Sequence, residues 1–405
     1  MSIKIGQRKG AITMPRGFQA SAVSCAIKGS GRLDLALLVS ERKATGAAVF
    51  TKNRVKAWPV LIGQKHIRSA ALKAVIVNSG NANCSNGIKN REKVEKYCGV
   101  LARFLKVAPR EIFPSSTGII GKDLPLAAVL SGIPTLVSRL SPGGGHTAAR
   151  AILTTDTRTK EAAATFALGG KRVKLAVMAK GAGMIHPDMA TTLIYFTTDI
   201  CIGRSLLKTA LKEVVDDTFN MMSVDNDMST NDTALILANG VAQNKCIRRK
   251  GHDYNLFVRA FKLLAWKTAK DLVCDGEGVR RVCEIHVTGA KNKTQAKAAA
   301  RSIANSMLFK TALHGGDPNF GRIVATLGAA RTVQCNFNAL SVVYGSSPVF
   351  KKGKPWHRNL RKAAQELRKK EVQLYVDLAC GKAKADYITS DLSKQYVSIN
   401  ADYST

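Results

Sequence analysis

The chain has 405 residues, 45% of them hydrophobic, and its 62 lysines and arginines against 28 aspartates and glutamates give a formal net charge of +34. This length can bury a large core in one or two domains, and a mean hydropathy of -0.04 is typical of a soluble globular protein. No apolar run reaches the roughly 18 residues of a membrane-spanning helix, and the first residues lack the apolar stretch of a secretory signal. We therefore expect neither a membrane protein nor a secreted one.

The positive charge raises the question of nucleic-acid binding, because a basic face binds phosphates by releasing counterions. The basic residues are scattered along the whole chain, however, and aromatic residues for base stacking make up only 6%. We expect non-specific nucleic-acid binding at most, with a modest attraction of anionic amino-acid substrates. A basic nucleic-acid-binding protein stays open as an alternative.

The nine cysteines are odd in number and contain no Cys-x-x-Cys pair, which fits neither a disulfide framework nor a zinc site. The seven histidines are dispersed and form no Glu-x-x-His or His-x-x-x-His pair. We therefore expect reduced thiols, a cytoplasmic location and no metal.

The residue pattern in the first third of the chain predicts three strands and one helix. Residues 35–40 and 47–51 have the composition of strands in a layered α/β protein, and 74–78 of a strand buried on both faces. The polar run 78–87 lacks the glycine spacing of a phosphate loop, so we expect a tight structural loop. Apolar residues at helical spacing predict a helix over 90–106.

Two loops in this part combine threonine with glycine or acid. In the loop 114–121, the Thr117-Gly118 pair can aim a hydroxyl and an amide at one point, as an oxyanion hole requires, although an ordinary turn has the same composition. The loop 154–157 is rich in threonine and follows a short apolar run.

The middle of the chain carries a glycine-rich loop between two predicted strands, 171–179 and 191–198. The loop ends at the Ala190-Thr191 junction, which suits an N-terminal nucleophile enzyme. Cleavage there would give Thr191 a free α-amine with an ordinary pKa of about 7.7–8.0, able to act as general base for its own hydroxyl. On composition alone, a threonine at the start of a strand simply reflects β-propensity.

The pattern of the second half predicts amphipathic helices over 206–219 and 256–273 and an alanine-rich helix over 294–309, followed by a half-sized α/β unit. Aspartates at 225–232 lack the glutamate that closes a calcium-binding EF-hand, so we expect a hydrogen-bonded turn near the site. Glu277 lies between two glycines on a short turn, where it can pair with a substrate amine. The loop 314–322 can place Asp317, Asn319 or Arg322 near substrate, with no role assigned to any of them.

The segment 180–191 resembles the cleavage segment of the glutamate N-acetyltransferase family, also called the ornithine acetyltransferase family, whose pattern runs Lys-Gly-Ser-Gly-Met-Ile-x-Pro-Asn-Met-Ala-Thr. Blocks similar to that family follow in one order over the whole chain, at 77–83, 116–121, 154–157, 219–220 with 224–225, 229–233, 275–278, 317–322 and 396–403. The resemblance implies an α/β fold of the N-terminal-nucleophile type, a layered sandwich of paired β-sheets flanked by helices.

The resemblance also implies self-cleavage between Ala190 and Thr191. An α chain (1–190) and a β chain (191–405) would then assemble as a heterotetramer of two of each. Thr191 would be the nucleophile, and Thr117 and Gly118 the oxyanion hole. The implied substrate-binding residues are Thr154, Lys180, Thr191, Glu277, Asn400 and the terminal Thr405, and Thr155 stays open as an alternative to Thr154.

The implied reaction moves acetyl from N-acetylornithine to Thr191 and then to glutamate, giving ornithine and N-acetylglutamate in the cyclic arginine pathway without a metal or organic cofactor. Some family members also use acetyl-CoA, and the sequence leaves this open. A same-fold aminopeptidase or amidohydrolase, whose second chain begins with serine, is the main alternative.

The chain departs from the family pattern at three places. Ala182 replaces a serine, Asp188 replaces an asparagine, and 224–228 reads Val-Asp-Asn-Asp-Met in place of Val-Asp-Gly-Asp-Thr. The charge of Asp188 lies close in sequence to the scissile bond and would slow cleavage by like-charge repulsion unless Lys180 screens it. We expect activity to survive these changes.

Overall fold

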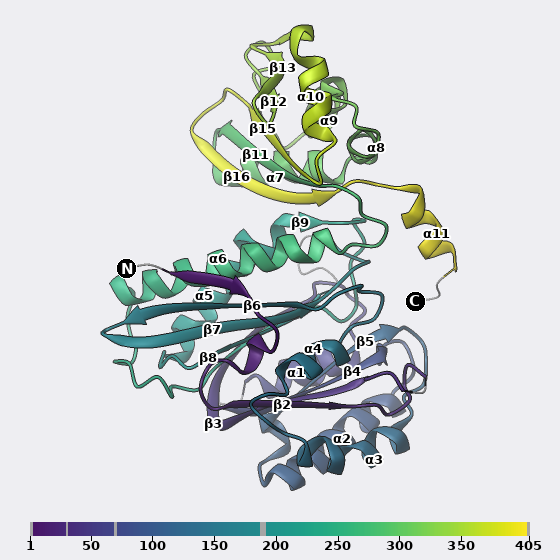
Figure 1. The fold of residues 1–405 in the computed structure, drawn as a ribbon, viewed down its shortest axis with the longest axis vertical. Coiled ribbons are helices and arrows are strands. Elements are labelled where there is room, and N and C mark those ends of the chain that lie inside the picture. The colour runs from purple at the N-terminus through teal and green to yellow at the C-terminus, as the bar shows by residue number, and fades with distance from the viewer. Residues whose placement is uncertain (1–2, 30, 69–70, 187–191, 403–405) are drawn as a thin grey trace.

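The computed structural model describes residues 3–29, 31–68, 71–186 and 192–402. The predictions for Ala190, Thr191, Asp188 and Thr405 concern residues outside these ranges. The described chain forms two units, a larger one around a nine-stranded sheet and a smaller one around a seven-stranded sheet, drawn below and above in Figure 1.

The larger sheet runs in the order β1-β6-β7-β8-β10-β3-β4-β5, with β2 paired to β3. Its strands are β1 (Lys4–Gln7), β2 (Phe18–Val23), β3 (Leu35–Phe50), β4 (Leu72–Asn81), β5 (Ile112–Ile119), β6 (Lys160–Leu168), β7 (Lys171–Lys180), β8 (Leu193–Thr198) and β10 (Thr233–Ala238).

Strand β3 joins the two halves of this sheet. Its first half pairs with β2 and β4, and its second half pairs with β10. The expectation of two separate strands at 35–40 and 47–51 is therefore wrong. The charged residues 41–43, which look like a turn in the sequence, form an exposed stretch of one continuous strand, next to a shift in register between Val39 and Ala44.

The two halves of the sheet form separate layers with an apolar interior between them. Because alternate side chains of a strand point to opposite faces, each buried strand contributes to two clusters. In β8, Tyr195 faces the space between the layers, whereas Ile194 and Phe196 face outward to α5 (Arg204–Asp217) and α6 (His252–Cys274). On the far side, α2 (Lys89–Leu105) and α3 (Leu126–Ser138) cover β3 and β4. The predicted layered α/β sandwich flanked by helices is thus confirmed.

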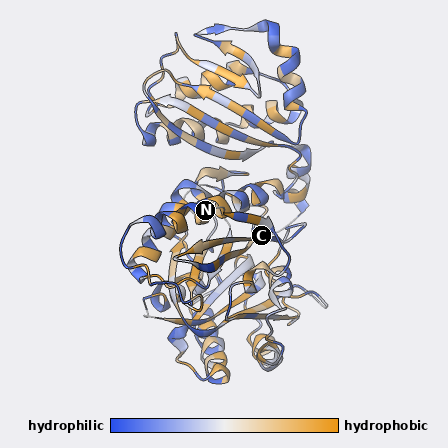
Figure 2. Cartoon of the chain, turned by 60° about the vertical axis from the view of Figure 1, so that its left-hand side comes forward, coloured by the Kyte–Doolittle hydropathy of each residue, from blue (hydrophilic) through white to orange (hydrophobic). Residues whose placement is uncertain are grey.

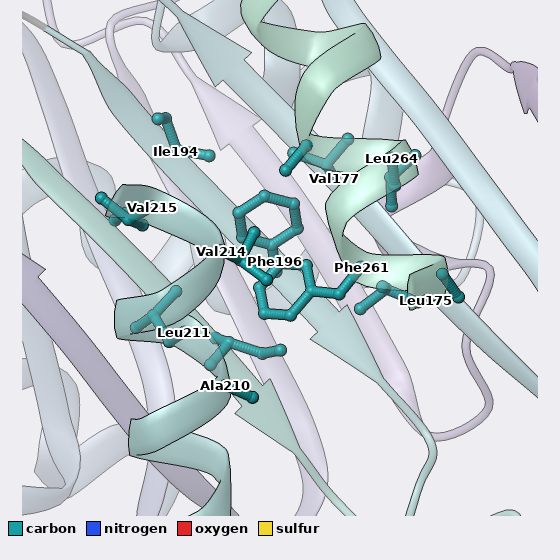
Figure 3. Packing of buried hydrophobic residues seen from close by; sticks show 14 of the residues in the cluster. Leu175, Val177, Ile194, Phe196, Ala210, Leu211, Val214, Val215, Phe261 and Leu264 are labelled. Carbon is teal, nitrogen blue, oxygen red and sulfur yellow. The ribbon is translucent and has the colours of Figure 1, made fainter. Parts of the chain in front are cut away.

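Figure 3 shows the core beneath α5 and α6. The ring of Phe196 meets that of Phe261 edge-on, with centroids 4.7 Å apart. Leu211 and Val214 belong to the predicted apolar face of 206–219 and are fully buried there. This helix and the one predicted over 256–273 are therefore confirmed.

The smaller unit has the strand order β14-β13-β12-β15-β11-β16-β9. Its elements are β9 (Met222–Ser223), β11 (Val282–Ala290), β12 (Ser341–Tyr344), β13 (Ser347–Lys351), β14 (Lys354–Pro355), β15 (Glu371–Asp377), β16 (Ala383–Ser390), α7 (Lys293–Asn305), α8 (Met307–Gly315), α9 (Phe320–Ala329) and α10 (Leu360–Leu367). The helix expected over 294–309 is divided in two, because Ser306 ends α7 and caps α8 by accepting the Phe309 amide. Apolar stretches run along the strands of both units in Figure 2.

The remaining helices are α1 (Trp58–His66), α4 (Gly145–Ala151) and α11 (Lys394–Asp402), with short 3-10 helices at Ala11–Thr13, Pro109–Glu111, Phe219–Met221 and His357–Asn359. Strand β9 pairs with β16, so the chain of the larger unit contributes an edge strand to the smaller sheet. Helix α11 returns from the smaller unit alongside the larger one (Figure 1).

Cysteine pairing differs from the expectation. Cys201, just after β8, forms a disulfide with Cys246, with Cα atoms 4.7 Å apart. The pair is 45 residues apart in sequence, so no local motif indicates it; Asn244 brings the two segments together by bonding the main chain of Cys201. The prediction that all thiols are reduced is wrong for this pair. Within the described residues, no helix combines the length and the apolar character needed to cross a membrane.

Candidate functional site

A cavity of about 490 Å³ lies where the ends of β5 and β7 meet the 225–231 loop, the turn after α6 and helix α11. Its lining includes every predicted site residue that the structure describes, namely Thr117, Gly118, Thr154, Lys180, Glu277 and Asn400. Thr155 lines it as well, so the choice between the two threonines stays open. Residues from six separate parts of the chain therefore converge on one space.

The end of β5 presents the hydroxyl and amide pair. Thr117 is almost fully buried, and its Oγ1 accepts a hydrogen bond from the Lys180 Nζ at 3.2 Å. Since that bond uses a lone pair of the hydroxyl, the hydroxyl hydrogen remains available to a ligand. Gly118 has φ +129°, and a Cβ there would lie 2.4 Å from the carbonyl carbon of Gly80 on β4. Glycine is therefore required at this position.

Lys180 belongs to a buried ionic cluster of two lysines and two aspartates. The Lys160 Nζ lies 2.5 Å from both the Asp156 Oδ1 and the Asp275 Oδ2. Lys180 approaches the Asp156 Oδ2 to 4.0 Å, and the Gly181 amide donates to Asp156 Oδ1 at 2.7 Å. All four side chains are at most 4% exposed. The cluster fixes the end of β7 against the loop that carries Thr154.

The cluster determines the charge at the cavity. Burial alone would raise the pKa of Asp156, but the charges of Lys160 and Lys180 outweigh it and lower that pKa to about 2. Burial lowers the pKa of Lys180, opposed chiefly by the attraction of Asp156. Asp156 is therefore an anion throughout the neutral range, and it favours the cationic form of the lysine beside Thr117.

Glu277 and Asn400 also line the cavity and contact each other. The Asn400 Nδ2 donates to the Glu277 Oε2 at 3.0 Å, which joins α11 to the turn after α6. The Glu277 amide donates to the Ala182 carbonyl at 3.0 Å. A Cβ at Gly183 would lie 2.5 Å from the Glu277 carboxylate, so this carboxylate packs directly on the glycine-rich loop. Asn400, which α11 carries, thus lies in the lining of the cavity.

Two aspartates hold the chain on either side of the segment 187–191. Asp225 accepts the amides of Met184 and Ile185 at 2.7 and 2.8 Å, and Asp232 accepts the Thr192 amide at 2.8 Å. Burial raises the pKa of Asp225 to about 6. These aspartates bind backbone amides, as the prediction of a hydrogen-bonded turn near the site requires. Asn226, at the usual glycine position of the family, has φ +68°, a conformation that asparagine tolerates better than most residues.

The loop 314–322 lies away from the cavity. Arg322 donates to the Leu308 carbonyl at 2.6 Å, Asn319 caps α9, and Asp317 accepts from Asn319 at 3.1 Å. None of the three is among the described residues that line the cavity. Their contacts hold α8 against α9.

Sequence reasoning overlooked Asp156, Lys160, Asp275 and Asn231. Asn231 lines the cavity, and its Nδ2 donates to the Ser116 carbonyl and the Ala82 carbonyl, each at 2.8 Å. Asp156, Asn231 and Asp275 lie inside the blocks that resemble the family, and this resemblance could have indicated them. Lys160 stands in an ordinary strand, and only the fold reveals its two acidic partners.

The cavity can bind and polarise a small zwitterion. Its lining offers a lysine and a hydroxyl donor, Lys180 and Thr117, together with the carboxyl groups of Asp225, Asp227 and Glu277. A carbonyl oxygen placed at the Thr117 end would be stabilised as it becomes an oxyanion. Among the described residues, no three His, Cys, Asp or Glu side chains are arranged to hold a metal ion.

Comparison with known proteins gives consistent matches. Residues 19–405 match the model of the ArgJ family. The arginine biosynthesis bifunctional protein ArgJ of Caldanaerobacter subterraneus subsp. tengcongensis is 40% identical over 402 residues, 98% of this chain and 99% of that protein. The protein of the same name from Geobacter sulfurreducens is 41% identical over 396 residues, 96% of this chain and 99% of its own.

Two solved structures resemble parts of the chain. The arginine biosynthesis bifunctional protein ArgJ of Bacillus halodurans is 33% identical, with 51% of this chain and 97% of that chain covered and a TM-score of 0.49. Ornithine acetyltransferase from Mycobacterium tuberculosis, complexed with ornithine, is also 33% identical, with 47% of this chain and 100% of that chain covered and a TM-score of 0.43.

The full-length matches and the polarising cavity define an acyltransferase of amino-acid biosynthesis. More particularly, the chain belongs to the ArgJ family, the bifunctional enzymes of arginine biosynthesis.

The substitution Asp156→Asn tests the contribution of the ionic cluster to stability. The folded-state pKa of Asp156, about 2, lies below its ordinary 3.8, so its ionisation stabilises the fold above about pH 4. This contribution, on the order of 2 kcal/mol, is lost as the pH falls through 2. We expect urea titrations to show a larger fall in the free energy of unfolding between pH 5 and pH 2.5 for wild type than for Asp156→Asn.

At pH 5, Asp156→Asn should be less stable than wild type by about 3–5 kcal/mol, because it leaves buried cations uncompensated. Asp123, an exposed residue paired with Lys93 at 2.6 Å, provides the control, and Asp123→Asn should cost no more than about 1 kcal/mol. Equal acid sensitivity in wild type and Asp156→Asn would contradict the assignment.

Proposed function

We propose that the enzyme transfers acetyl from N-acetylornithine to glutamate through an acetyl-Thr191 intermediate, after self-cleavage between Ala190 and Thr191. The supporting observation is the convergence of Thr117, Gly118, Lys180, Glu277 and Asn400 on a single cavity. The relatives' name, arginine biosynthesis bifunctional protein, fits this reaction. So does the presence of ornithine in the structure of the Mycobacterium tuberculosis enzyme.

Charge complementarity suggests how the substrate is oriented. The α-carboxylate of N-acetylornithine would face Lys180, and its side-chain ammonium would face Glu277, which Asn400 holds in place. The hydroxyls of Thr154 and Thr155 line the same space, and either can bond to the substrate. Thr405, beyond the described end of α11, is proposed as a further contact.

The chemical steps follow from this orientation. The Thr191 hydroxyl attacks the acetyl carbonyl while its own α-amine takes the proton, and Thr117 and Gly118 stabilise the oxyanion. The C–N bond then breaks, the leaving amine receives the proton, and ornithine departs. The amine of glutamate attacks the resulting ester and releases N-acetylglutamate, which restores the Thr191 hydroxyl.

The sheet explains how two fragments would remain one enzyme. Strands β8 and β10, which follow the proposed cut, lie between β7 and β3, which precede it. The fragments 1–190 and 191–405 would therefore stay joined by two strand pairings and a shared core. We further propose that two copies of each fragment form a heterotetramer, and that acetyl-CoA serves as a second acetyl donor.

Acetyl transfer can be separated from hydrolysis in one assay. N-Acetylornithine incubated with purified enzyme and glutamate should yield N-acetylglutamate and ornithine in equal amounts. Without glutamate, ornithine release should stop after about one equivalent per site, because the ester intermediate has no acceptor. Steady release of free acetate with no acetylated glutamate would instead favour the aminopeptidase or amidohydrolase alternative.

Intact mass tests the cleavage. We expect two fragments, 1–190 and 191–405, from wild type, and one uncut chain from Thr191→Ala, which lacks the attacking oxygen. Thr192→Ala is the matched control and should still be cut, since the Thr192 contact to Asp232 is made by its backbone amide. A cut Thr191→Ala chain, or a new N-terminus at another residue, would refute the assignment.

Two substitutions of Thr117 test the proposed oxyanion hole. In Thr117→Val the side chain keeps its shape but loses the donor, so kcat should fall by about 10²–10³. Thr117→Ser keeps the hydroxyl and should retain most of the activity. If the valine variant has the kcat of wild type, the hydroxyl does not stabilise the oxyanion.

A further inference from the structure

A second cavity, of about 460 Å³, adjoins the candidate site. Thr154 lines both spaces, so they share one residue. The second cavity has three basic side chains in its lining, Lys28, Arg32 and Lys122, and the other described residues there are alanine, isoleucine, glycine and Thr154. We call this space the basic pocket.

Lys28 connects the basic pocket to the candidate site. Its Nζ donates to the carbonyls of Ala151 and Leu153 at 3.3 and 2.9 Å, and Leu153 is joined directly to Thr154. Because an ammonium has three hydrogens, one remains for a ligand. A Cβ at Gly80 would lie 2.5 Å from the Lys28 Cγ, so the stem of the lysine packs on the end of β4. The Lys28 ammonium therefore lies next to the peptide that carries Thr154.

The positive charge of the basic pocket is not neutralised by its neighbours. Among the described residues, no carboxylate lines this pocket, and neither Arg32 nor Lys122 forms an ion pair. Asp34 is fully buried, and its two oxygens accept backbone amides of the loop 25–28. Burial lowers the pKa of Lys28 to about 8, and repulsion from Arg32 is the next largest cause, although Asp34 opposes both. A bound anion would relieve this repulsion.

A third cavity, of about 470 Å³ between α5, α6 and α7, shows how lysines are arranged when their role is structural. Its lining includes as many acidic residues as lysines. Asp217 pairs with the Nζ atoms of Lys262, Lys293 and Lys297 at 3.1, 2.8 and 2.8 Å. These lysines are neutralised within the protein, whereas the charges of the basic pocket remain available to a ligand.

The proposed reaction requires a place for a second anionic group. In the orientation proposed for N-acetylornithine, the α-carboxylate faces Lys180 and the side-chain ammonium faces Glu277. If glutamate bound in the same way, its side-chain carboxylate would face Glu277, in a cavity that Asp225 and Asp227 also line. Like charges at close range repel each other. The side chain of glutamate therefore needs a different site from that of ornithine.

We propose that the basic pocket binds the side-chain carboxylate of the acceptor glutamate, while the amine of glutamate reaches the acetyl group in the candidate site. The inference rests on the proposed function and names how its second substrate is recognised. Lys28, Arg32 and Lys122 would donate charge-assisted hydrogen bonds to the carboxylate. The two substrates would share the acetyl position and direct their side chains into different spaces.

The test follows the two half-reactions separately in the double variant Arg32→Gln/Lys122→Gln. Both side chains are exposed and make no ion pair within the described residues, so the fold should be retained. We expect the KM for glutamate to rise about tenfold or more, because charge-assisted hydrogen bonds are lost. The KM for N-acetylornithine, and the single equivalent of ornithine released without glutamate, should stay as in wild type.

Glutamine provides a second readout, because it matches glutamate in shape but has no side-chain charge. Wild type should have the higher kcat/KM with glutamate, and the double variant should lose most of this preference. A merely structural defect would lower kcat/KM for both acceptors alike. The control is Arg361→Gln/Lys362→Gln on α10, which removes the same charge from exposed positions that line neither cavity and should keep the preference.

Four results would contradict these expectations in different ways. An unchanged KM for glutamate in the double variant, or an equal rise for both substrates, would refute the proposed subsite. Loss of the preference in the α10 control would show that net charge, and not the basic pocket, selects the acceptor. A wild type that forms no N-acetylglutamate would instead refute the proposed function itself. Should the double variant fail to fold, Lys122→Gln alone must raise the KM for glutamate and leave that for N-acetylornithine unchanged.

Discussion

The site depends on keeping a lysine charged inside the protein. Burial works against the cationic form of Lys180, and Asp156 counteracts it while being held by Lys160 and the Gly181 amide. Such an arrangement stabilises the fold only while every member has its partner. It joins β6, β7, the loop containing Thr154 and the turn after α6, so these ionic contacts hold Lys180 where it lines the cavity.

Much of the fold follows from residue patterns because most of its elements are regular. The periodic apolar face of α5 and the unbroken apolar run of β4 lead to the observed elements. The continuity of β3 could not be predicted, because a run of charged residues such as 41–43 is compatible both with a turn and with an exposed part of a strand. The Cys201–Cys246 pair likewise depends on which segments the sheet brings together.

The site was predictable where chemistry is carried by a local motif. Thr117, Gly118, Lys180 and Glu277 each belong to a short glycine-containing block that matches the family. Asp156 and Asp275 also lie in blocks that resemble the family, but their partner Lys160 lies in a regular strand, and only the fold brings it between the two carboxylates. A short glycine-containing block therefore marks a candidate site residue, whereas a buried partner within a regular strand leaves no local pattern in the sequence.

The strand order has a consequence for how the molecule comes into being. Since β8 and β10 are inserted between β7 and β3, the central sheet is complete only when segments on both sides of position 190 are in place. In an uncut precursor these segments belong to the same molecule, and the connecting chain keeps them at high local concentration. If the chain is cut between 190 and 191 as proposed, an unfolded molecule would have to find its other fragment by diffusion. The two-chain form would thus be easy to maintain but slow to rebuild, so that its lifetime depends on resisting unfolding rather than on recovering from it.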